Sequence, residues 1–240
     1  MLKIDNVEVL GWEHAIRGMR NPKNSWEKSD SCPCNFPNEC LVACDKKECE
    51  GGNHFYVGPN DRKLMMTLRN AGTDHRKFMR MIVVYLDITA PLYWWKEFDT
   101  YKVGTVANSC STMHTIHKKE FKLGDFSCEQ LTHTEQCASN NPAYQMGDYY
   151  FPEYASIDIL ILTVEALNYN RERYLETKDK KYWWQMIQLL PMSYNQKRTV
   201  MLNYEVLANM YKSRRNHKLD EWHTLCDWME TLPYSDLITD

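Results

Sequence analysis

Glycine is scarce in this sequence of 240 residues, and glycine-rich phosphate loops are absent from it. The chain has nine glycines, and neither GxGxxG nor GxxxxGK[ST] occurs. Both motifs bring backbone N–H groups close to phosphate oxygens. Their absence excludes a standard dinucleotide-binding loop and a P-loop, so any phosphate would have to be held by side chains.

Three further features are missing. No apolar run approaches the roughly 18–20 residues that a membrane-spanning helix needs. The first ten residues, MLKIDNVEVL, lack the apolar region of a signal peptide. The net charge is −3, so no cationic excess points to nucleic acid. We therefore expect a cytoplasmic protein that binds neither membranes nor nucleic acids.

Aromatic and sulfur-containing residues are abundant instead. The chain is 43% hydrophobic and 12% aromatic, with eight Trp, fifteen Tyr and nine Cys. This composition predicts a folded core rather than disorder. The cysteine count is odd and no export signal is present, which favours free thiols in a reducing compartment.

The hydrophobic pattern predicts a helix-rich α+β fold, a single domain with a central sheet. Residues 81–88 (MIVVYLDI) are β-branched and apolar, which is typical of a buried strand. Helical spacing or composition marks residues 61–71, 92–101, 156–167, 181–190 and 206–211. Residues 11–60 and 102–113 are expected to be irregular. We divide the chain into an irregular, cysteine-rich segment (1–60) and the main domain (61–240).

Three groups of residues are candidate sites in their own right. Five cysteines fall within 18 residues and could bind zinc as a small interaction module, but they do not form CxxC pairs: Cys32, Cys34, Cys40, Cys44 and Cys49. Their spacing favours free cysteines, so no metal ligands are assigned. Cys110 with His114 lacks the other signatures of a cysteine hydrolase. His114 with His117 lacks a third metal ligand.

The segment APLYWWKEFDTYKVGTVANSCSTM (90–113) resembles the signature of the flavin-dependent thymidylate synthases. That signature has an Ala-Pro pair, a helix with Arg-Gln-Trp, and then RHRxxSxNxxSxR. Lys96-Glu97-Phe98 stand at Arg-Gln-Trp, and Thr100-Tyr101-Lys102 stand at Arg-His-Arg. Thr105 takes the first Ser, and after one extra residue Asn108 and Ser111 match the Asn and the second Ser.

Further blocks resemble the same family in the same order between about residues 60 and 230. AGTDHRKF, with His75, resembles the glycine–histidine turn before the family's first long strand. In LLPMSYNQKRTVMLNYEVLANMYKSR, four residues match in register, while Glu205 replaces an Arg: Asn203, Leu207, Asn209 and Arg214. Glu221-Trp222 then matches a Gln-Trp pair.

The resemblance implies a homotetramer with FAD bound where subunits meet. It implies transfer of a methyl or methylene group to C5 of a pyrimidine deoxynucleotide, with dUMP as the default and another pyrimidine nucleotide as an option. NADPH and methylenetetrahydrofolate would be the co-substrates. Arg214 would be catalytic, stabilising charge on the pyrimidine. It would share the nucleotide with Glu97 and Ser111, and the cofactor would contact His75, Lys102, Asn108, Asn203 and Asn209.

The sequence departs from the family at the phosphate. Met113 and Ile187 occupy positions where the family has phosphate-binding arginines. Each such pair is worth roughly 1.5–3 kcal/mol, so losing two weakens phosphate binding about 10²- to 10⁴-fold. The sequence IRGMRNPKNSW offers replacement cations, of which Arg20 is our candidate nucleotide ligand. The alternative is a non-catalytic flavin- or nucleotide-binding protein of the same fold.

Overall fold

The structure is a computed structural model that describes residues 1–33, 55–132, 145–146, 149–150 and 155–239. Four of the five clustered cysteines, Cys34, Cys40, Cys44 and Cys49, lie outside these residues. The predicted zinc alternative is therefore not tested. No helix among the described residues is long and apolar enough to cross a membrane.

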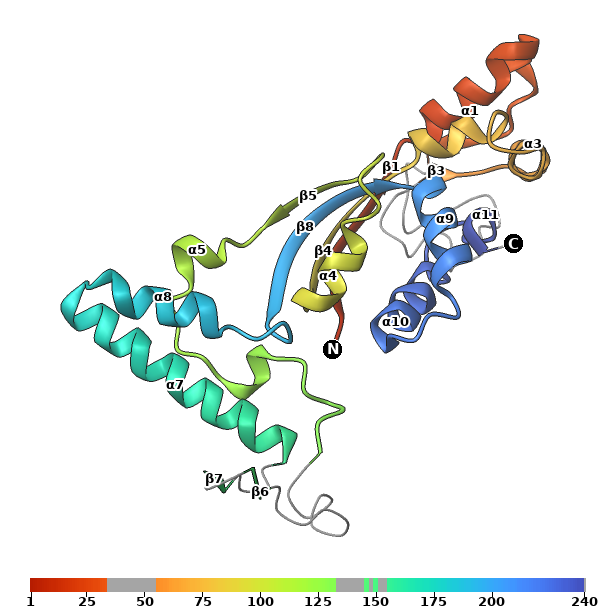
Figure 1. The fold of residues 1–240 in the computed structure, drawn as a ribbon. Coiled ribbons are helices and arrows are strands. Elements are labelled where there is room, and N and C mark those ends of the chain that lie inside the picture. The colour runs from red at the N-terminus through yellow and green to blue at the C-terminus, as the bar shows by residue number, and fades with distance from the viewer. Residues whose placement is uncertain (34–54, 133–144, 147–148, 151–154, 240) are drawn as a thin grey trace, which may run out of the picture. The chain divides into compact units, whose positions relative to one another are not determined.

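A four-stranded sheet has the order β1-β4-β8-β5 (Figure 1). Its strands are β1 (Lys3–Leu10), β4 (Val83–Pro91), β8 (Asn195–Asn203) and β5 (Val106–Ser109). β1 and β4 are antiparallel, with Lys3 opposite Thr89 and Leu10 opposite Val83. β4 confirms the strand expected at 81–88, and every second residue from Val84 to Ala90 is at most 1% exposed. β5 lies in a stretch that we expected to be a loop, so that expectation is wrong there.

The described chain falls into two compact units, which we consider separately. The first unit comprises Met1, Ala90–Lys96 and Ser109–Lys197; the second comprises Leu2–Thr89, Glu97–Asn108 and Arg198–Asp240. The predicted division at residue 60 stays a prediction.

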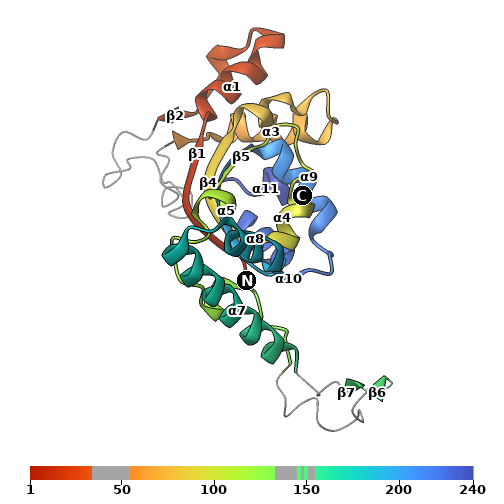
Figure 2. The same cartoon turned by 60° about the vertical axis from the view of Figure 1, so that its left-hand side comes forward.

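The first unit is built around a helical hairpin. α7 (Ser156–Thr177) and α8 (Lys180–Leu189) pack side by side (Figures 1 and 2). Both confirm predicted helices, although Ala155 rather than Ser156 is the N-cap of α7. The hairpin also shares an apolar core with Ile116, which follows the short helix α5 (Thr112–Thr115), and with Phe121 and Phe126, which flank η4 (Leu123–Asp125).

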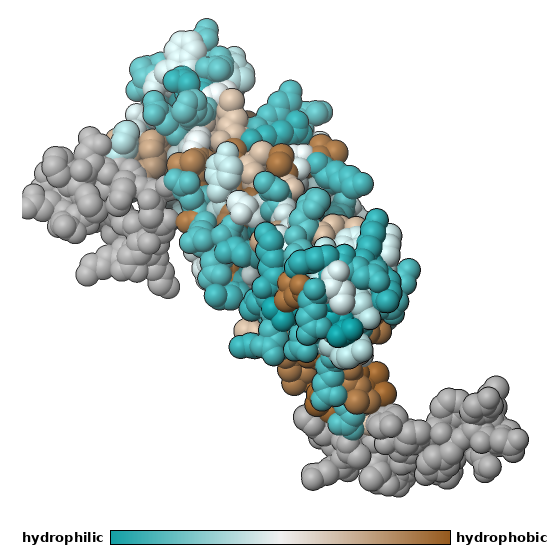
Figure 3. Space-filling view, turned by 90° about the vertical axis from the view of Figure 1, so that its left-hand side faces the viewer, coloured by the Kyte–Doolittle hydropathy of each residue, from teal (hydrophilic) through white to brown (hydrophobic). Residues whose placement is uncertain are grey.

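α7 also carries apolar side chains that its own unit does not cover. Ile159, Ile161 and Leu162 are 48%, 41% and 48% exposed. Figure 3 shows hydrophobic residues gathered near the start of α7, beside a largely hydrophilic surface. Contiguous exposed apolar residues of this kind commonly mark contacts with another chain.

The second unit contains the remaining helices. They are α1 (Trp12–Arg20), η1 (Asn21–Lys23), η2 (Trp26–Lys28), α3 (Pro59–Asn70), η3 (Arg76–Met81), α9 (Tyr204–Arg214), α10 (Asp220–Met229) and α11 (Asp236–Thr239). α4 (Leu92–Phe98) begins in the first unit and ends in the second. Two further sheets have two antiparallel strands each: β2 (Cys32–Pro33) pairs with β3 (Phe55–Tyr56), and β6 (Gln145–Met146) pairs with β7 (Tyr149–Tyr150).

α1 corrects the expectation that residues 11–60 are irregular throughout. Its buried side chains, Trp12, Ala15, Ile16 and Met19, recur at helical spacing and face the core of the second unit. Trp12 packs edge-to-face on Tyr204 and Tyr234, with ring centres 5.3 and 5.0 Å away. The Pro and Asn residues that suggested irregular structure follow the helix instead of interrupting it.

Candidate functional site

The start of α9 is fixed by Asn203, one of the residues predicted to contact flavin. Its Oδ1 accepts a hydrogen bond from the backbone N–H of Val206 at 3.1 Å, which makes Asn203 the N-cap of the helix. Its Nδ2 donates to the carbonyl of Gly104 at 3.5 Å. Gly104 has a φ of +77°, and a Cβ there would lie 3.0 Å from Asn203 Nδ2. Both the positive φ and this close approach favour a glycine where the turn meets the helix.

The last turn of α9 holds Arg214 in one orientation. Its Nη1 donates to Glu97 Oε2 at 2.6 Å, and its Nε donates to the hydroxyl of Tyr101 at 2.9 Å. The guanidinium carbon lies 4.7 Å from the centre of the buried Trp222 ring, within the range of a cation–π contact. The Arg214 side chain is still 17% exposed. The structure thus brings together two predicted nucleotide residues and leaves the cation accessible.

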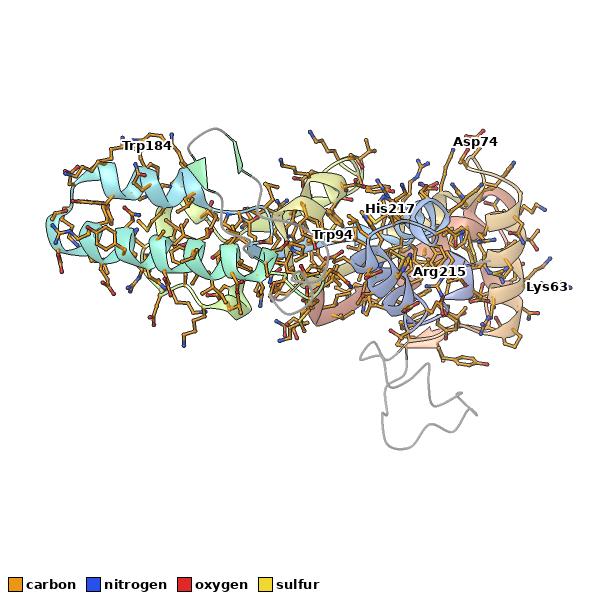
Figure 4. All side chains as sticks on the ribbon, turned by 60° about the horizontal axis from the view of Figure 1, so that its bottom comes forward. Lys63, Asp74, Trp94, Trp184, Arg215 and His217 are labelled. Carbon is orange, nitrogen blue, oxygen red and sulfur yellow. The ribbon has the colours of Figure 1, made fainter. Side chains whose placement is uncertain are left out.

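His217 completes this cluster, and sequence reasoning missed it. Its Nε2 lies 3.3 Å from Glu97 Oε2, and its ring is 6.2 Å from that of Trp222. In Figure 4 it lies beside the helices that carry Arg214 and Trp222. Its position three residues after Arg214 was the only available signal. We call Glu97, Tyr101, Arg214, His217 and Trp222 the Arg214 cluster.

A small pocket of about 210 Å³ adjoins the Arg214 cluster at Tyr101. Lys102 and Arg198 line it, and Arg198 Nη1 bonds Asp99 Oδ1 at 2.7 Å. The buried Oγ1 of Thr105 has no hydrogen-bond partner within the described parts of the chain. A buried hydroxyl that can donate, next to two cations, suits a phosphate oxygen. The pocket therefore fits part of a phosphorylated cofactor, such as the one expected near Lys102.

Asn209 belongs to a second charged network on α9. Its Oδ1 accepts from Arg76 Nη2 at 3.1 Å, while Arg76 and Arg80 both bind the carboxylate of Glu205. Burial alone would raise the pKa of Glu205, but hydrogen bonds and charge from the two arginines outweigh it and hold the pKa below its usual value. The acid that replaces the family's Arg is thus neutralised within the protein.

Arg20, our candidate nucleotide ligand, is buried at the end of a helix and does not lie in an exposed loop. It ends α1, is 4% exposed, and its Nε donates to the fully buried Asp61 at 2.6 Å. Its other nitrogens donate to the carbonyls of Ser25 and Lys28 at 3.1 and 3.0 Å. The guanidinium is occupied within the fold, and this packing does not favour its assignment to a nucleotide.

The buried carboxylate of Asp61 accepts hydrogen bonds from several groups. The hydroxyls of Ser29 and Ser31 donate to its Oδ2 at 2.7 and 2.6 Å. Burial would raise the pKa of Asp61, yet bonds from the two serines and Arg20 prevail and lower it. The pair joins α3 to the segment that follows α1.

The remaining predicted site residues do not contact the Arg214 cluster in the described parts of the chain. His75 and Asn108 are exposed in the second unit. Ser111, in the first unit, caps α5 by accepting from the backbone N–H of His114 at 3.2 Å. Ile187 packs against the apolar core of the first unit, while Met113 is 47% exposed. Apolar packing explains Ile187 without any contact to phosphate.

Comparison with known proteins identifies the fold. No family model and no curated protein sequence matches this chain. Among solved structures, Thymidylate Synthase X of Helicobacter pylori with FAD and dUMP superposes with a TM-score of 0.61 at 17% identity, covering 99% of this chain and 96% of that one. A second structure, of the flavin-dependent thymidylate synthase from the same organism with the same ligands, gives 0.60 at 18% identity, covering 98% of each chain.

A related enzyme shares the same architecture. The UMP/dUMP methylase PolB of Streptomyces cacaoi, bound with 5-Br UMP, gives a TM-score of 0.56 at 12% identity, covering 99% of this chain and 95% of that one. The chain therefore has the fold of the flavin-dependent thymidylate synthases, and the predicted α+β class with a central sheet is confirmed.

Proposed function

We propose that this protein is a flavin-dependent transferase that methylates a pyrimidine deoxynucleotide at C5, with dUMP as the default substrate. The observation that carries the proposal is Arg214, a partly exposed cation oriented by Glu97 and Tyr101. A preoriented cation stabilises charge that develops on a bound ring without the cost of reorganising. The shared fold supports the same reaction class, because solved proteins of this fold hold dUMP or UMP analogues.

The chain's own residues would divide the work. Arg214 would face the pyrimidine, with Glu97 and Ser111 beside the nucleotide. Lys102, with Arg198 and Thr105, would hold a cofactor phosphate, and His75, Asn108, Asn203 and Asn209 would contact FAD. Oδ1 of Asn203 and of Asn209 each accepts one hydrogen bond within the protein, and each amide keeps a further lone pair and an N–H for the cofactor. A bound FAD would supply the reducing equivalents, NADPH would reduce it, and methylenetetrahydrofolate would donate the carbon.

The test begins with the absorption spectrum of the purified protein. We expect a yellow protein, or FAD uptake on addition, and bleaching of the flavin by NADPH. We then expect dUMP or another pyrimidine nucleotide to raise the melting temperature. At 100 times its dissociation constant, a ligand stabilises the native state by about 2.7 kcal/mol. A protein that takes up no FAD would refute the flavin enzyme.

A binding protein of the same fold is the second candidate function. It is favoured by Met113 and Ile187, which replace two phosphate-binding arginines of the family, Ile187 being packed in an apolar core. This candidate predicts binding of flavin or nucleotide without formation of a methylated product. Product analysis by mass spectrometry, in the presence of NADPH and methylenetetrahydrofolate, separates the two.

We also propose a homotetramer, as the family resemblance implies. The exposed apolar residues of α7 supply a surface that association would cover. Light scattering is expected to give four times the chain mass, and Ile159→Asp with Leu162→Asp to reduce it. Glu172→Ala is a matched control because Glu172 lies on the same helix and is charged. A monomeric wild-type protein would contradict the assembly.

A further inference from the structure

A charged side chain lies on the buried stripe of α7 in the first unit. Leu160, Val164 and Leu167 of this stripe are at most 9% exposed. Arg171 follows Leu167 by four residues and precedes Tyr174 by three, so it continues the same face of the helix. Tyr174 packs against the apolar core that this stripe forms. An arginine therefore stands at a position where the helical pattern calls for an apolar residue.

The loop that follows α5 runs along this face of α7 and brings a histidine to it. The side-chain amide of Asn168 exchanges two hydrogen bonds of 2.9 Å with the backbone of Phe121. The ring of His117 packs edge-to-face on Tyr174, with ring centres 5.1 Å apart. Asn168 and Tyr174 lie about one helical turn on either side of Arg171. Arg171 therefore faces the loop between these two contacts.

Neither of these two basic groups is occupied by the protein. Within the described residues, the side chain of Arg171 makes no hydrogen bond or ion pair, and its Nε is enclosed without a partner. Nδ1 of His117 is likewise enclosed without a partner in that part of the chain. Arg173, the next arginine of α7, instead binds Glu176 at 2.8 Å. Buried polar groups are nearly always paired, so the arginine on the buried stripe calls for an anion.

The available donors suit a tetrahedral oxyanion. Arg171 and His117 are both partly exposed, so a ligand can reach the terminal nitrogens of the guanidinium. A guanidinium presents its N–H groups as a planar fork that pairs with two phosphate oxygens. An imidazole N–H adds a third donor from another direction. On the same loop, exposed Lys118 adds positive charge, whereas Glu120 is an exposed acid. A chloride ion would use fewer of these donors.

We propose that Arg171 and His117 form an oxyanion site of the first unit, which binds a phosphate group, free or as the monoester end of a small molecule. Arg171 supplies the charge and the fork, and His117 supplies the third donor. Neither residue belongs to the Arg214 cluster or to the sequence blocks that resemble the flavin-dependent thymidylate synthases. The inference therefore does not depend on the proposed methyl transfer.

Calorimetry with inorganic phosphate, at constant ionic strength, tests the proposal on the full chain. We expect saturable binding that Arg171→Gln weakens about 10-fold or more, because a charge-assisted pair is lost. Arg171→Lys should fall between the two, since an ammonium keeps the charge but lacks the planar fork. His117→Ala should weaken binding by about 2- to 10-fold, the range expected for one hydrogen bond.

Arg173→Gln is the matched control for these variants. Arg173 lies two residues further along α7 and carries the same charge, but it is already paired with Glu176 on the surface. We expect this variant to change phosphate affinity less than about twofold. An equal loss in Arg173→Gln and Arg171→Gln would show that phosphate responds only to the net charge of the helix, and would overturn the proposal.

Chemical modification places the bound phosphate. Diethyl pyrocarbonate modifies accessible imidazoles, and peptide mass spectrometry reports each histidine separately. Phosphate should slow the modification of His117 about threefold or more and that of His114 less than about twofold, because His114 is exposed and lies outside the site. Equal protection of the two histidines would contradict a site at His117.

The stability of the protein without ligand separates a binding role from a structural one. An arginine that awaits an anion is an unpaired, partly buried charge, so Arg171→Leu should leave the melting temperature unchanged or raise it. Phosphate should raise the melting temperature of the wild type but not that of Arg171→Leu. A large loss of stability in Arg171→Leu without phosphate would identify a structural arginine and refute the site.

Nucleotide probes distinguish the two sources of phosphate. If dUMP displaces inorganic phosphate in an Arg171-dependent way and deoxyuridine does not, the site binds the phosphate end of a nucleotide. If neither displaces it, the site binds free phosphate or another monoester. Absence of any phosphate binding would overturn the proposal. FAD uptake is a separate measurement, so the failure of this site and the failure of the proposed flavin enzyme can be told apart.

Discussion

Replacing Asp61 with alanine is expected to lower the free energy of unfolding by about 3–5 kcal/mol. The substitution leaves the guanidinium of Arg20, which is 4% exposed, without its counter-ion. It also removes the acceptor of two serine hydroxyls. Chemical denaturation measures the change. The matched control is Glu176→Ala, which removes the acid of the exposed pair with Arg173 and should cost less than about 1 kcal/mol.

The same pair makes a prediction about pH. The pKa of Asp61 is lower in the folded protein than its ordinary value, so its carboxylate contributes stability above that ordinary value. This contribution is lost as the pH falls through the folded pKa. The difference in stability between the wild type and Asp61→Asn should therefore shrink in acid. A difference that stays constant from neutral to acid pH would contradict a stabilising ionised Asp61.

Arg214→Ala is expected to lower kcat/KM for methylation about 10²- to 10³-fold, the usual effect of losing one preorganised group that stabilises transition-state charge. Stabilisation by the pyrimidine nucleotide should also disappear, whereas the flavin spectrum should remain. Arg214→Lys should fall between the two, because an ammonium keeps the charge but cannot bond Glu97 and Tyr101 through a planar fork.

Arg215→Ala is the matched control for this experiment. Arg215 is the next residue in the chain, but it binds Asp227 and Glu230 on the surface instead of the Arg214 cluster. We expect it to change kcat/KM less than about threefold, since exposed ion pairs contribute little. Equal losses of kcat/KM in the two variants would show that any change at this end of α9 impairs the protein. Arg214 would then have no specific role in stabilising transition-state charge.

Parts of the fold with strong local patterns could be predicted from the sequence. The β-branched apolar run of residues 81–88 predicted β4, and the helical spacing of apolar residues predicted α3, α7 and α8. β8 was not predicted as a strand, because polar and charged residues are interspersed with its buried ones. Its sequence is NQKRTVMLN, in which Val200 and Leu202 are buried. α1 was not predicted as a helix, because the turn-forming residues that follow it dominate the composition of residues 11–60.

The candidate site shows a different limit. Glu97 and Arg214 were identified separately by position, yet their contact joins residues 117 apart in the chain. No local pattern specifies such a pairing, because it depends on how α4 and α9 come together. Arg20 shows the same limit, because its position among polar and basic residues suggested a ligand for phosphate, whereas the structure pairs it with Asp61, 41 residues away in the chain. That Arg20 has a structural partner is evident only in the fold, where Asp61 is fully buried and bonded to it.

The turn at Gly104 joins the residues of the small pocket to the start of helix α9. This turn lies between Lys102 and Thr105, which line the small pocket, and it packs directly on the cap of α9, the helix that ends at Arg214. A side chain added there would press on Asn203 and Val206 at the helix start and would strain the turn, because its φ is +77°. Changes of substrate preference by directed evolution should therefore arise more readily at side chains around this turn than in the turn itself. Libraries that fix Gly104 and Asn203 would retain more folded members.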